Sequence, residues 1–362
     1  MKTPDSNALA RLRLALIPGL GPITQRKLVE RFGTASAALA AGNALAGFAG
    51  AALATAVARG ADEALVERTL RWLDAPERHL IAFEDEAYPD LLREITDPPG
   101  VLFAIGDIDL LRAPSIAVVG ARNATPQGVR DAHAMSHALS AAGLCVTSGL
   151  ALGIDAAAHR GGLDGRGSSV AVMGTGPDIF YPRGNRQLAQ RLASEGCVVT
   201  ELPLGTPPFA GNFPRRNRLI SGLARAVLVV EANERSGSLV TAHCALEQDR
   251  EVLAMPGSIH SPLSKGCHKL IREGATLVEC AADVLAELGM AIDLAPVASC
   301  AHAPTSDLVL AALGQAPATH DQLVMRTGLE AAKVAARLCL LQVEGRVEEI
   351  PGGRFQRVAG PA

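Results

Sequence analysis

Aromatic side chains are scarce in this sequence and make up only 3% of its 362 residues. The sequence also lacks a CxxC pair, and its seven cysteines are widely spaced and lie mostly in apolar runs. Neither a zinc site nor a disulfide framework is supported by this pattern. We therefore expect buried thiols in a reducing compartment, which predicts a cytoplasmic protein.

A strong excess of one charge is missing as well, because 34 lysines and arginines face 37 acidic residues. Any binding of nucleic acid must then come from local basic patches. Residues 32–58 carry no charge, but they are mostly alanine and are interrupted by glycines. Short helices fit this composition better than a membrane span, so we expect no membrane contact.

Acidic residues are also absent between Glu201 and Glu231, in a segment broken by proline, asparagine and glycine. The arginines of this interval are Arg215, Arg216, Arg218 and Arg225. Guanidinium groups without neighbouring carboxylates predict an anion site, and their planar fork suits phosphate. The alternative is a solvated arginine surface on an ordinary α/β protein.

The first 75 residues predict a helical domain, with helices over 9–16, 24–32 and 61–73. The turn Pro18-Gly19-Leu20-Gly21-Pro22 joins the first two helices. It resembles a helix-hairpin-helix (SAM-like) turn, whose backbone N–H groups bind phosphate, and it fits a plain helical hairpin equally well. Residues 76–114, rich in proline and acidic residues, are expected to form a connector.

Short apolar runs then alternate with helical stretches. The expected strands are 116–119, 144–147, 170–173, 198–201, 226–230, 251–255 and 276–278. Such strands imply a parallel sheet covered on both faces, so we predict an α/β, Rossmann-like domain over 81–289. After a linker at 290–304, three helices and a hairpin predict a winged helix over 305–360.

Glycine-rich or polar loops follow consecutive strands of the predicted sheet. Ligands of open α/β sheets bind at the carboxyl ends of the strands, where glycines and helix N-termini present N–H groups to anions. The loops contain Gly120 with Arg122; Ser148 with Gly149; Gly174, Arg183 and Asn185; and Ser236, Gly237 and Ser238. The GxGxxG fingerprint is absent after the first strand, which argues against NAD.

No arrangement of catalytic residues stands out, so we expect no enzyme and no cofactor. Asp155 and His159 are spaced i,i+4, but a helix-capping Asp and a polar His explain them better than catalysis. His133 and His137 share a helix face without a third ligand, so we expect no metal. Paired carboxylates of a two-metal nuclease and a GxSxG elbow are missing too.

Taken together, the motifs resemble those of the DNA-processing protein A (DprA/Smf) family over nearly the whole chain. The resemblance rests on VVGAR at 118–122, SGLA at 148–151 with GID at 153–155, AAH at 157–159, YP at 181–182 with Asn185, Glu201, FPRRNR at 213–218 with Ile220 and Gly222, EA at 231–232, SGSL at 236–239 with TA at 241–242, and PG at 256–257.

The resemblance implies a homodimer that binds single-stranded DNA, protects it and helps to load the RecA recombinase during natural transformation. It assigns the main DNA contacts to Arg122 and Arg183. Residues of the other motifs are candidate contacts too: Gly120, Ser148, Gly149, Gly174, Asn185, Arg215, Arg216, Asn217, Arg218, Ser236, Gly237 and Ser238. Leu152 stands where many relatives have arginine, and Gly184 where an acidic residue is common.

Stacking platforms for bases are few, and the candidates are Phe180, Tyr181, Phe209 and Phe213. Two other functions remain open: a nucleotide-processing, phosphoribohydrolase-like enzyme using Glu201 and Glu231, and a winged-helix transcription regulator. Residues 305–362 hold six basic and six acidic residues. This balance predicts a docking or dimer-supporting role for the winged helix rather than a DNA-reading one.

Overall fold

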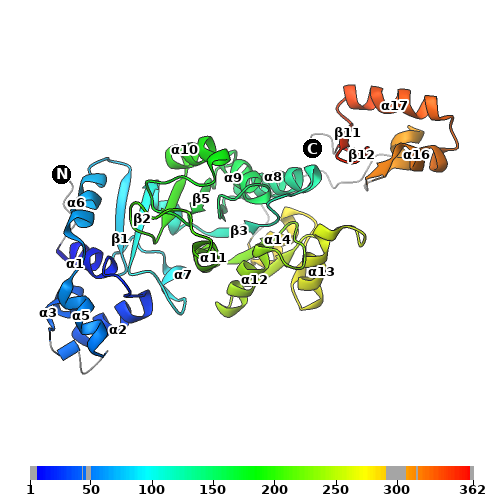
Figure 1. Cartoon of the computed structure of the whole chain (residues 1–362). Coiled ribbons are helices and arrows are strands. Elements are labelled where there is room, and N and C mark those ends of the chain that lie inside the picture. Colours follow the sequence, from blue (N-terminus) through cyan, green and yellow to red (C-terminus); the bar gives the residue numbers. More distant parts are fainter. Residues whose placement is uncertain (1–5, 43, 46–49, 291–306, 315–316, 359–362) are drawn as a thin grey trace. The chain divides into compact units, whose positions relative to one another are not determined.

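The computed structural model describes residues 6–42, 44–45, 50–290, 307–314 and 317–358 (Figure 1). The chain divides into two compact units, residues 1–292 and 293–362. The N-terminal helices and the large sheet belong to the first unit, so the predicted boundary between them stays a prediction. The predicted linker lies outside the described residues apart from residue 290.

The N-terminal region is helical, as predicted. Its main helices are α1 (Ser6–Ala15), α2 (Pro22–Phe32), α3 (Ala35–Ala40), α5 (Ala51–Arg59) and α6 (Glu63–Trp72). Pro22 occupies the first turn of α2, where its missing N–H costs nothing, and Gly33 ends the helix with a φ of 86°. Among the described residues, no helix is both long enough and apolar enough to span a membrane.

A nine-stranded sheet forms the centre of the first unit, in the order β1-β2-β6-β5-β4-β3-β7-β8-β9. Its strands are β1 (Arg78–Ala82), β2 (Val101–Gly106), β3 (Ser115–Val119), β4 (Cys145–Ser148), β5 (Ser169–Val172), β6 (Cys197–Thr200), β7 (Ala226–Val229), β8 (Glu251–Ala254) and β9 (Thr276–Leu277). Strands β3 to β9 run parallel, which confirms the Rossmann-like prediction.

The predicted connector at 76–114 is wrong, because it contains β1 and β2. Strand β2 pairs antiparallel with both β1 and β6 and is buried along almost its whole length. Most of the prolines and acidic residues of this region lie in the turns and the short helix α7 (Asp90–Arg93) between the two strands. Breaker residues in the long connection therefore masked two strands at one end of the sheet.

Helices cover both faces of the sheet (Figure 1). One core packs the sheet against α9 (Ile154–Leu163) and α10 (Arg186–Glu195), and the other packs it against α11 (Asn212–Gly222), α12 (Gly237–Glu247) and α13 (Lys265–Arg272). Two further helices are α8 (Pro126–Ala141), which packs on α9, and α14 (Ala281–Glu287).

Helix α11 corrects the expectation of a broken segment around the arginines. It begins at Asn212, and Pro214 lies in its first turn, where no backbone hydrogen bond is lost. Its proline therefore starts the helix rather than breaking it. The arginines of α11 therefore face different surroundings, because a helix points successive side chains in different directions.

The second unit is a winged helix, as predicted. It contains α15 (Leu308–Leu313), β10 (Ala318–Thr319), α16 (His320–Thr327), α17 (Ala331–Val343), β11 (Val347–Ile350) and β12 (Arg354–Arg357). Gly328 ends α16 in the left-handed region, with a φ of 68°. The short strand β10, which the sequence does not reveal, pairs with β12.

The prediction of buried thiols holds for only part of the cysteines. Cys145, Cys197 and Cys267 are buried, whereas Cys280 and Cys339 are exposed. Cys300 lies outside the described residues.

Candidate nucleic-acid interface

The polar loops of the sequence analysis meet at the carboxyl edge of the sheet. Backbone hydrogen bonds join them. The N–H of Ala121 donates to the carbonyl of Glu231 at 2.7 Å, and the N–H of Ile154 donates to the carbonyl of Ala121 at 3.2 Å. Asn212 Nδ2 likewise donates to the carbonyl of Gly174 at 3.3 Å. The loops after β3, β4, β5 and β7 thus form one continuous surface.

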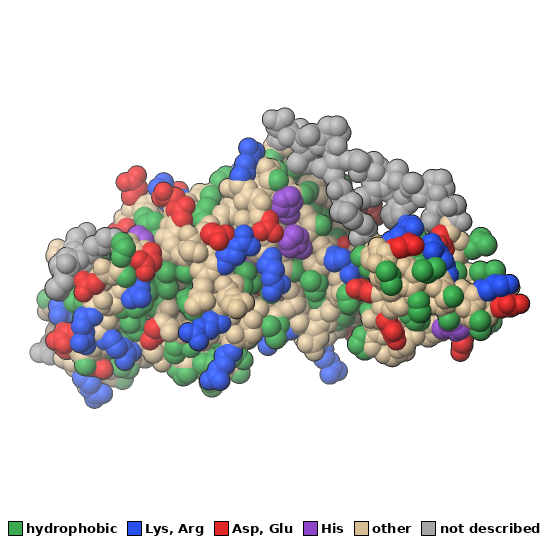
Figure 2. Space-filling view, turned by 90° about the horizontal axis from the view of Figure 1, so that it is seen from above, with side chains coloured by type: hydrophobic (Ala, Val, Ile, Leu, Met, Phe, Trp, Pro, Cys, Tyr) green, Lys and Arg blue, Asp and Glu red, His purple; other side chains and the backbone are tan. Residues whose placement is uncertain are grey.

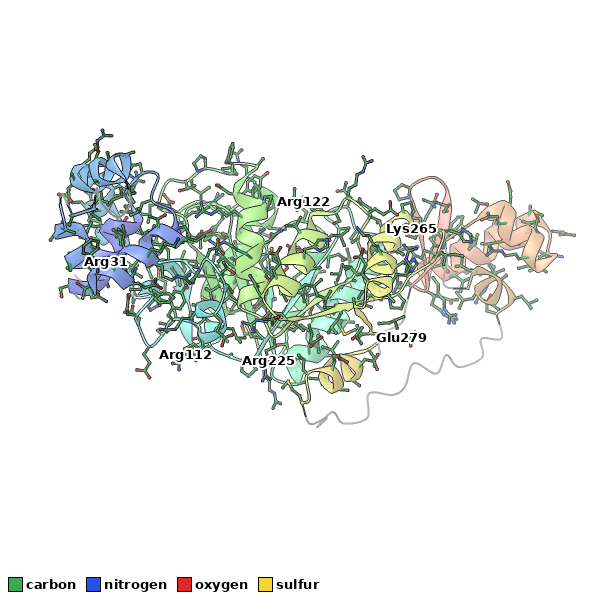
Figure 3. The ribbon with its side chains drawn as sticks, turned by 90° about the horizontal axis from the view of Figure 1, so that it is seen from below. Arg31, Arg112, Arg122, Arg225, Lys265 and Glu279 are labelled. Atoms are coloured by element: carbon green, nitrogen blue, oxygen red, sulfur yellow. The ribbon has the colours of Figure 1, made fainter. Side chains whose placement is uncertain are left out.

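The two arginines that the resemblance assigns to DNA, Arg122 and Arg183, are both exposed at this edge. Neither forms an ion pair with a carboxylate within the described part of the chain. The guanidinium of Arg122 lies 5.8 Å from the centre of the Phe213 ring, and Figure 3 labels this arginine at one side of the sheet. Both charges are therefore available to an anion in solvent.

An aromatic pair lies beside Arg122. The rings of Tyr181 and Phe213 are 5.6 Å apart and tilted by 37°, and Tyr181 is 43% exposed. Of the other stacking candidates, Phe209 is exposed whereas Phe180 packs against the core. Two tilted aromatic rings and an exposed guanidinium group thus lie next to each other at the edge, and we call Tyr181 and Phe213 the aromatic platform.

Arg216 lies beneath these loops rather than on their surface. Its Nη1 donates to the carbonyl of Gly149 at 2.7 Å and to that of Val172. Asp155 faces it and accepts the N–H groups of Gly149 at 3.1 Å and Ala151 at 3.3 Å. Burial lowers the pKa of Arg216 to about 10 and raises that of Asp155. The pair holds the loop after β4 in place.

Arg218 is also turned inward, which corrects the expectation of arginines without carboxylates. Its Nη2 lies 2.6 Å from Glu201, and its Nε lies 2.9 Å from Asp97. Arg215 is half-exposed, with its Nε 3.5 Å from the same Glu201. The neutralising acids come from outside the arginine-rich interval.

Arg225 lies at the opposite edge of the sheet. Its N–H donates to the carbonyl of Ser115, at the amino ends of β3 and β7, over 3.0 Å. Figure 3 shows Arg122 and Arg225 on opposite sides. The arginines that are close in sequence therefore do not form one patch.

Several predicted site residues serve the scaffold. The Oγ of Ser148 donates to the carbonyl of Val118 at 2.6 Å. Asn185 is buried, and its Nδ2 donates to Leu150 at 2.9 Å and Ala151 at 3.0 Å. A Cβ at Gly120 would lie 2.6 Å from Ile154 Cγ1, so a side chain does not fit there.

Gly174 and the start of α12 complete the predicted set. A Cβ at Gly174 would lie 2.8 Å from the Phe213 ring, so this glycine makes room for the aromatic platform. Ser236 caps α12, with its Oγ 2.7 Å from that of Ser238, and Gly237 borders open space. Asn217 Nδ2 donates to the carbonyl of Gly237 at 3.3 Å. The α12 N-terminus is thus accessible to an anion.

The acidic and histidine residues considered for catalysis have structural partners. His159 is fully buried: its Nε2 accepts the N–H of Leu150 at 3.2 Å, and its Nδ1 lies 2.8 Å from Ser169 Oγ. Glu231 accepts from Thr125, at 2.9 Å from its N–H and 2.6 Å from its hydroxyl. These contacts favour structural roles for Asp155 and His159 over catalysis. The expected helix cap is wrong, because Gly153 is the N-cap of α9 and Asp155 accepts N–H groups of the preceding loop.

Metal ligation finds no support in the described ranges, which contain no group of three or more His, Cys, Asp or Glu side chains placed for an ion. His133 instead lies 3.1 Å from Asp164.

Two exposed basic residues of this edge were missed by the sequence analysis. Arg235 lies in the loop after β7, and Lys265 begins α13. The N–H of Gly266 donates to the carbonyl of Ala232 at 2.8 Å, which places Lys265 beside the β7 loop. Arg235 lies in the loop after a predicted strand, and that position could have identified it from the sequence. Lys265 lies too far beyond β8 for the same reasoning.

The two departures from the family pattern are neighbours. Leu152 Cδ2 lies 3.5 Å from where a Cβ would stand at Gly184. The two positions therefore lie side by side at this edge.

Comparison with known families identifies the chain. A family model described as DNA recombination-mediator protein A matches residues 79–289, more than half of the chain. The chain belongs to this family. Models of a DprA-like N-terminal HHH domain and a DprA winged helix domain match residues 5–67 and 294–353. The family resemblance is confirmed, and the helix-hairpin-helix interpretation is favoured over a plain hairpin.

Relatives cover most of the chain. Protein Smf of Escherichia coli is 42% identical over 298 residues, 80% of each protein, and DNA processing protein DprA of Streptococcus pneumoniae is 47% identical over 203 residues, 56% of this chain and 72% of that one. The crystal structure of the S. pneumoniae protein has a TM-score of 0.67 at 36% identity and covers 79% of this chain and 99% of its own.

A second solved structure concerns the single-stranded DNA binding mode of DNA processing protein A from Helicobacter pylori. Its TM-score is 0.54 at 26% identity, and the match covers 59% of this chain and 95% of that one.

Proposed function

We propose that this protein is a recombination mediator that binds single-stranded DNA along the carboxyl edge of its sheet. The observation that carries the proposal is the exposed pair Arg122 and Arg183, without carboxylate partners in the described structure, beside the aromatic platform of Tyr181 and Phe213. Single strands are held without sequence preference by basic grooves combined with stacking platforms. The subject of the H. pylori structure supports the same ligand.

The proposed contacts divide by exposure. Phosphates meet Arg122, Arg183, the half-exposed Arg215 and the α12 N-terminus at Ser236–Ser238. Gly120, Ser148, Gly149, Gly174 and Asn185 shape the loops, and Arg216 and Arg218 hold them from within. Asn217 and the newly located Arg235 and Lys265 extend the surface. Because aromatic platforms are few, phosphate contacts dominate, and binding should be sensitive to salt.

A gel-shift series tests the proposal with single-stranded and duplex oligonucleotides of equal length, with and without Mg²⁺ and ATP. We expect the single strand to shift at lower protein concentration, without cleavage. A preference for duplex, or cleavage that co-purifies with the protein and depends on metal, would contradict the proposal.

We infer that the protein is not an enzyme. The two acids that a nucleotide-processing enzyme would use are engaged elsewhere, Glu201 with Arg218 and Glu231 with Thr125. Incubation with nucleoside monophosphates tests this alternative. Release of free base at a rate proportional to protein concentration would support the enzyme.

We also propose, on family membership, that the protein acts in the cytoplasm as a homodimer, protects incoming DNA and helps to load RecA during natural transformation. Each part has a separate measurement: nuclease resistance of bound strands, sedimentation mass, and RecA ATPase activity on strands covered by single-strand-binding protein. Absence of any RecA stimulation at saturating protein would exclude the loading role.

A further inference from the structure

The helix α17 of the winged helix presents an apolar face to solvent. We call Ala332, Ala335, Ala336, Cys339, Leu340 and Val343 the outer face of α17; all are exposed, with Leu340 at 55% and Val343 at 88%. Val334, Leu338 and Leu341 on the other side are buried in the core of the unit. Apolar residues at i, i+4, i+7 and i+11 form a stripe along a helix. Figure 2 shows hydrophobic side chains scattered over the surface of this unit.

The outer face does not suit DNA. A winged helix that reads DNA normally presents basic side chains on this helix. Here Lys333 pairs with Glu330 at 3.3 Å, and Arg337 pairs with Asp307 at 2.5 Å and Glu344 at 3.3 Å. No charged residue belongs to the outer face itself. Its chemistry therefore points to a protein surface.

Side-chain size changes along the outer face in a way that makes the face complementary to itself. Its first half contains only alanines, and its second half contains Cys339, Leu340 and Val343. Large side chains pack best against small ones on the facing element. Two copies of the helix achieve this only when they run antiparallel, because a parallel pair would place large residues on large residues.

The charges at the two ends of α17 favour the same arrangement. Glu330 and Arg346 both lie eight residues from Leu338, on opposite sides, and both are exposed. Lys333 lies five residues before Leu338 and Glu344 six residues after it, and their side chains are 66% and 41% exposed. In an antiparallel pair centred near Leu338, each acid faces a base of the second copy. In a parallel pair, like charges would meet.

We propose that the outer face of α17 packs antiparallel against α17 of a second copy of this chain. The contact is isologous, as a two-fold symmetric dimer requires. It deepens the dimer-supporting role of the winged helix that we predict from its charge balance, and it does not depend on DNA binding. A helix of 13 residues is about 20 Å long and offers far less than the roughly 1,000 Å² of a stable interface. The contact therefore adds to other contacts between the chains rather than replacing them.

Cross-linking through Cys339 tests the proposal in the full chain. Cys280→Ser removes the other exposed cysteine of the described residues, Cys300→Ser removes one that lies outside them, and Cys339 remains near the proposed two-fold axis. The matched control carries Cys339→Ser and Arg354→Cys on the exposed wing. A short bismaleimide should form dimers roughly tenfold faster through Cys339 than through the control, because contact raises the effective concentration. Equal rates would overturn the proposal.

Two further variants test the face and the register. Val343→Asp changes a residue that is 88% exposed, so it should leave the melting temperature unchanged and abolish the fast cross-link. Glu330→Lys should slow cross-linking, and Arg346→Glu added to it should restore the rate. A double variant as slow as the single one would overturn the antiparallel register.

Labelling of Cys339 with a monofunctional maleimide shows which molecule covers the outer face of α17, a second copy or another part of the same chain. On dilution, Cys339 should become freely reactive. Protection that persists in dilute monomer would show that the same chain covers the face, which overturns the proposal. Because DNA binding is measured separately by gel shift, either result leaves the DNA proposal to its own test.

Discussion

Arginines in this protein serve two purposes, and burial separates them. Arg122 and Arg183 are exposed, whereas Arg216 and Arg218 are 5% and 7% exposed and hydrogen-bonded inside the fold. Removing a guanidinium from water costs several kcal/mol unless carbonyls or carboxylates replace the lost solvent. The buried arginines have such partners, so their hydrogen bonds stabilise loops of the protein and are not available to a ligand.

Replacing Arg122 or Arg183 with glutamine should weaken single-strand binding similarly for all base sequences. Each lost phosphate contact should reduce the slope of log K against log salt by about 0.7, as expected for single strands. Fluorescence anisotropy over a salt series measures the slope. Arg225→Gln is the matched control, because this exposed arginine lies at the opposite edge and should change nothing. A slope unaltered in the folded Arg122 and Arg183 variants would remove both from the interface.

Replacing Arg216 with methionine should destabilise the fold. The change leaves Asp155 buried without its cationic partner and the carbonyls of Gly149 and Val172 without a donor. Leaving a buried polar group without its hydrogen-bond partner typically costs about 1–3 kcal/mol. Urea unfolding of the variant and the parent measures the difference. If Arg216→Met keeps parental stability but loses DNA, Arg216 is a ligand contact instead.

At the level of elements, helix α9 fixes the loop after β4. His159 accepts the N–H of Leu150, a residue in the left-handed region with a φ of 57°. Its other nitrogen faces Ser169 Oγ, which itself donates to the carbonyl of Val146 at 2.6 Å. Because Nε2 accepts and Nδ1 donates, the imidazole must be neutral. Burial lowers the pKa of His159 to about 3.

Stability should therefore depend on pH through His159. The folded pKa lies below the ordinary value, so the unfolded chain binds the proton first as pH falls below about 6.5. The contribution of His159 to the free energy of unfolding is constant above that pH. Below it, the free energy of unfolding falls by up to about 1.4 kcal/mol per pH unit toward a pH of about 3.

Urea unfolding near neutral pH and again in mildly acidic buffer measures the pH dependence. His159→Gln should flatten it at some cost in stability, whereas His243→Gln, at an exposed histidine, should leave it unchanged. An identical pH dependence in parent and His159→Gln would contradict the buried neutral imidazole.

The whole molecule carries little net charge, and basic and acidic side chains are mixed on its surface. The net charge is −3, and Figure 2 shows basic and acidic side chains interspersed over the face that it presents. Affinity for DNA must then reside in a defined edge. The winged helix should add little, because residues 305–362 hold six basic and six acidic residues. The two units have separate cores, which allows their roles to be separated by truncation.

A truncated protein ending near Pro304 should keep most of its affinity for single strands. Gel shifts with the full and shortened chains at equal salt make the comparison, and circular dichroism verifies that the first unit remains folded. Complete loss of binding in a folded truncation would show that the winged helix contacts DNA.

Local sequence determined much of this protein. The parallel strands are continuous apolar runs because both of their faces are covered, so β3 to β9 could be located within a residue or two. The carboxyl ends of parallel strands share one edge, so the loops of Gly120, Gly149, Gly174 and Gly237 could be expected to meet.

Tertiary structure alone decided what each side chain of that edge faces. Arg218 finds Asp97, which lies 121 positions earlier in a region that predicted only a connector, and Arg216 finds carbonyls of two other loops. Helix α11 turns these two arginines inward, leaves Arg215 half-exposed and precedes Arg225 at the opposite edge. Residue type and spacing report the chemistry that a segment can supply. Burial and ion pairing depend on segments distant in sequence, so they emerge only when the chain is packed.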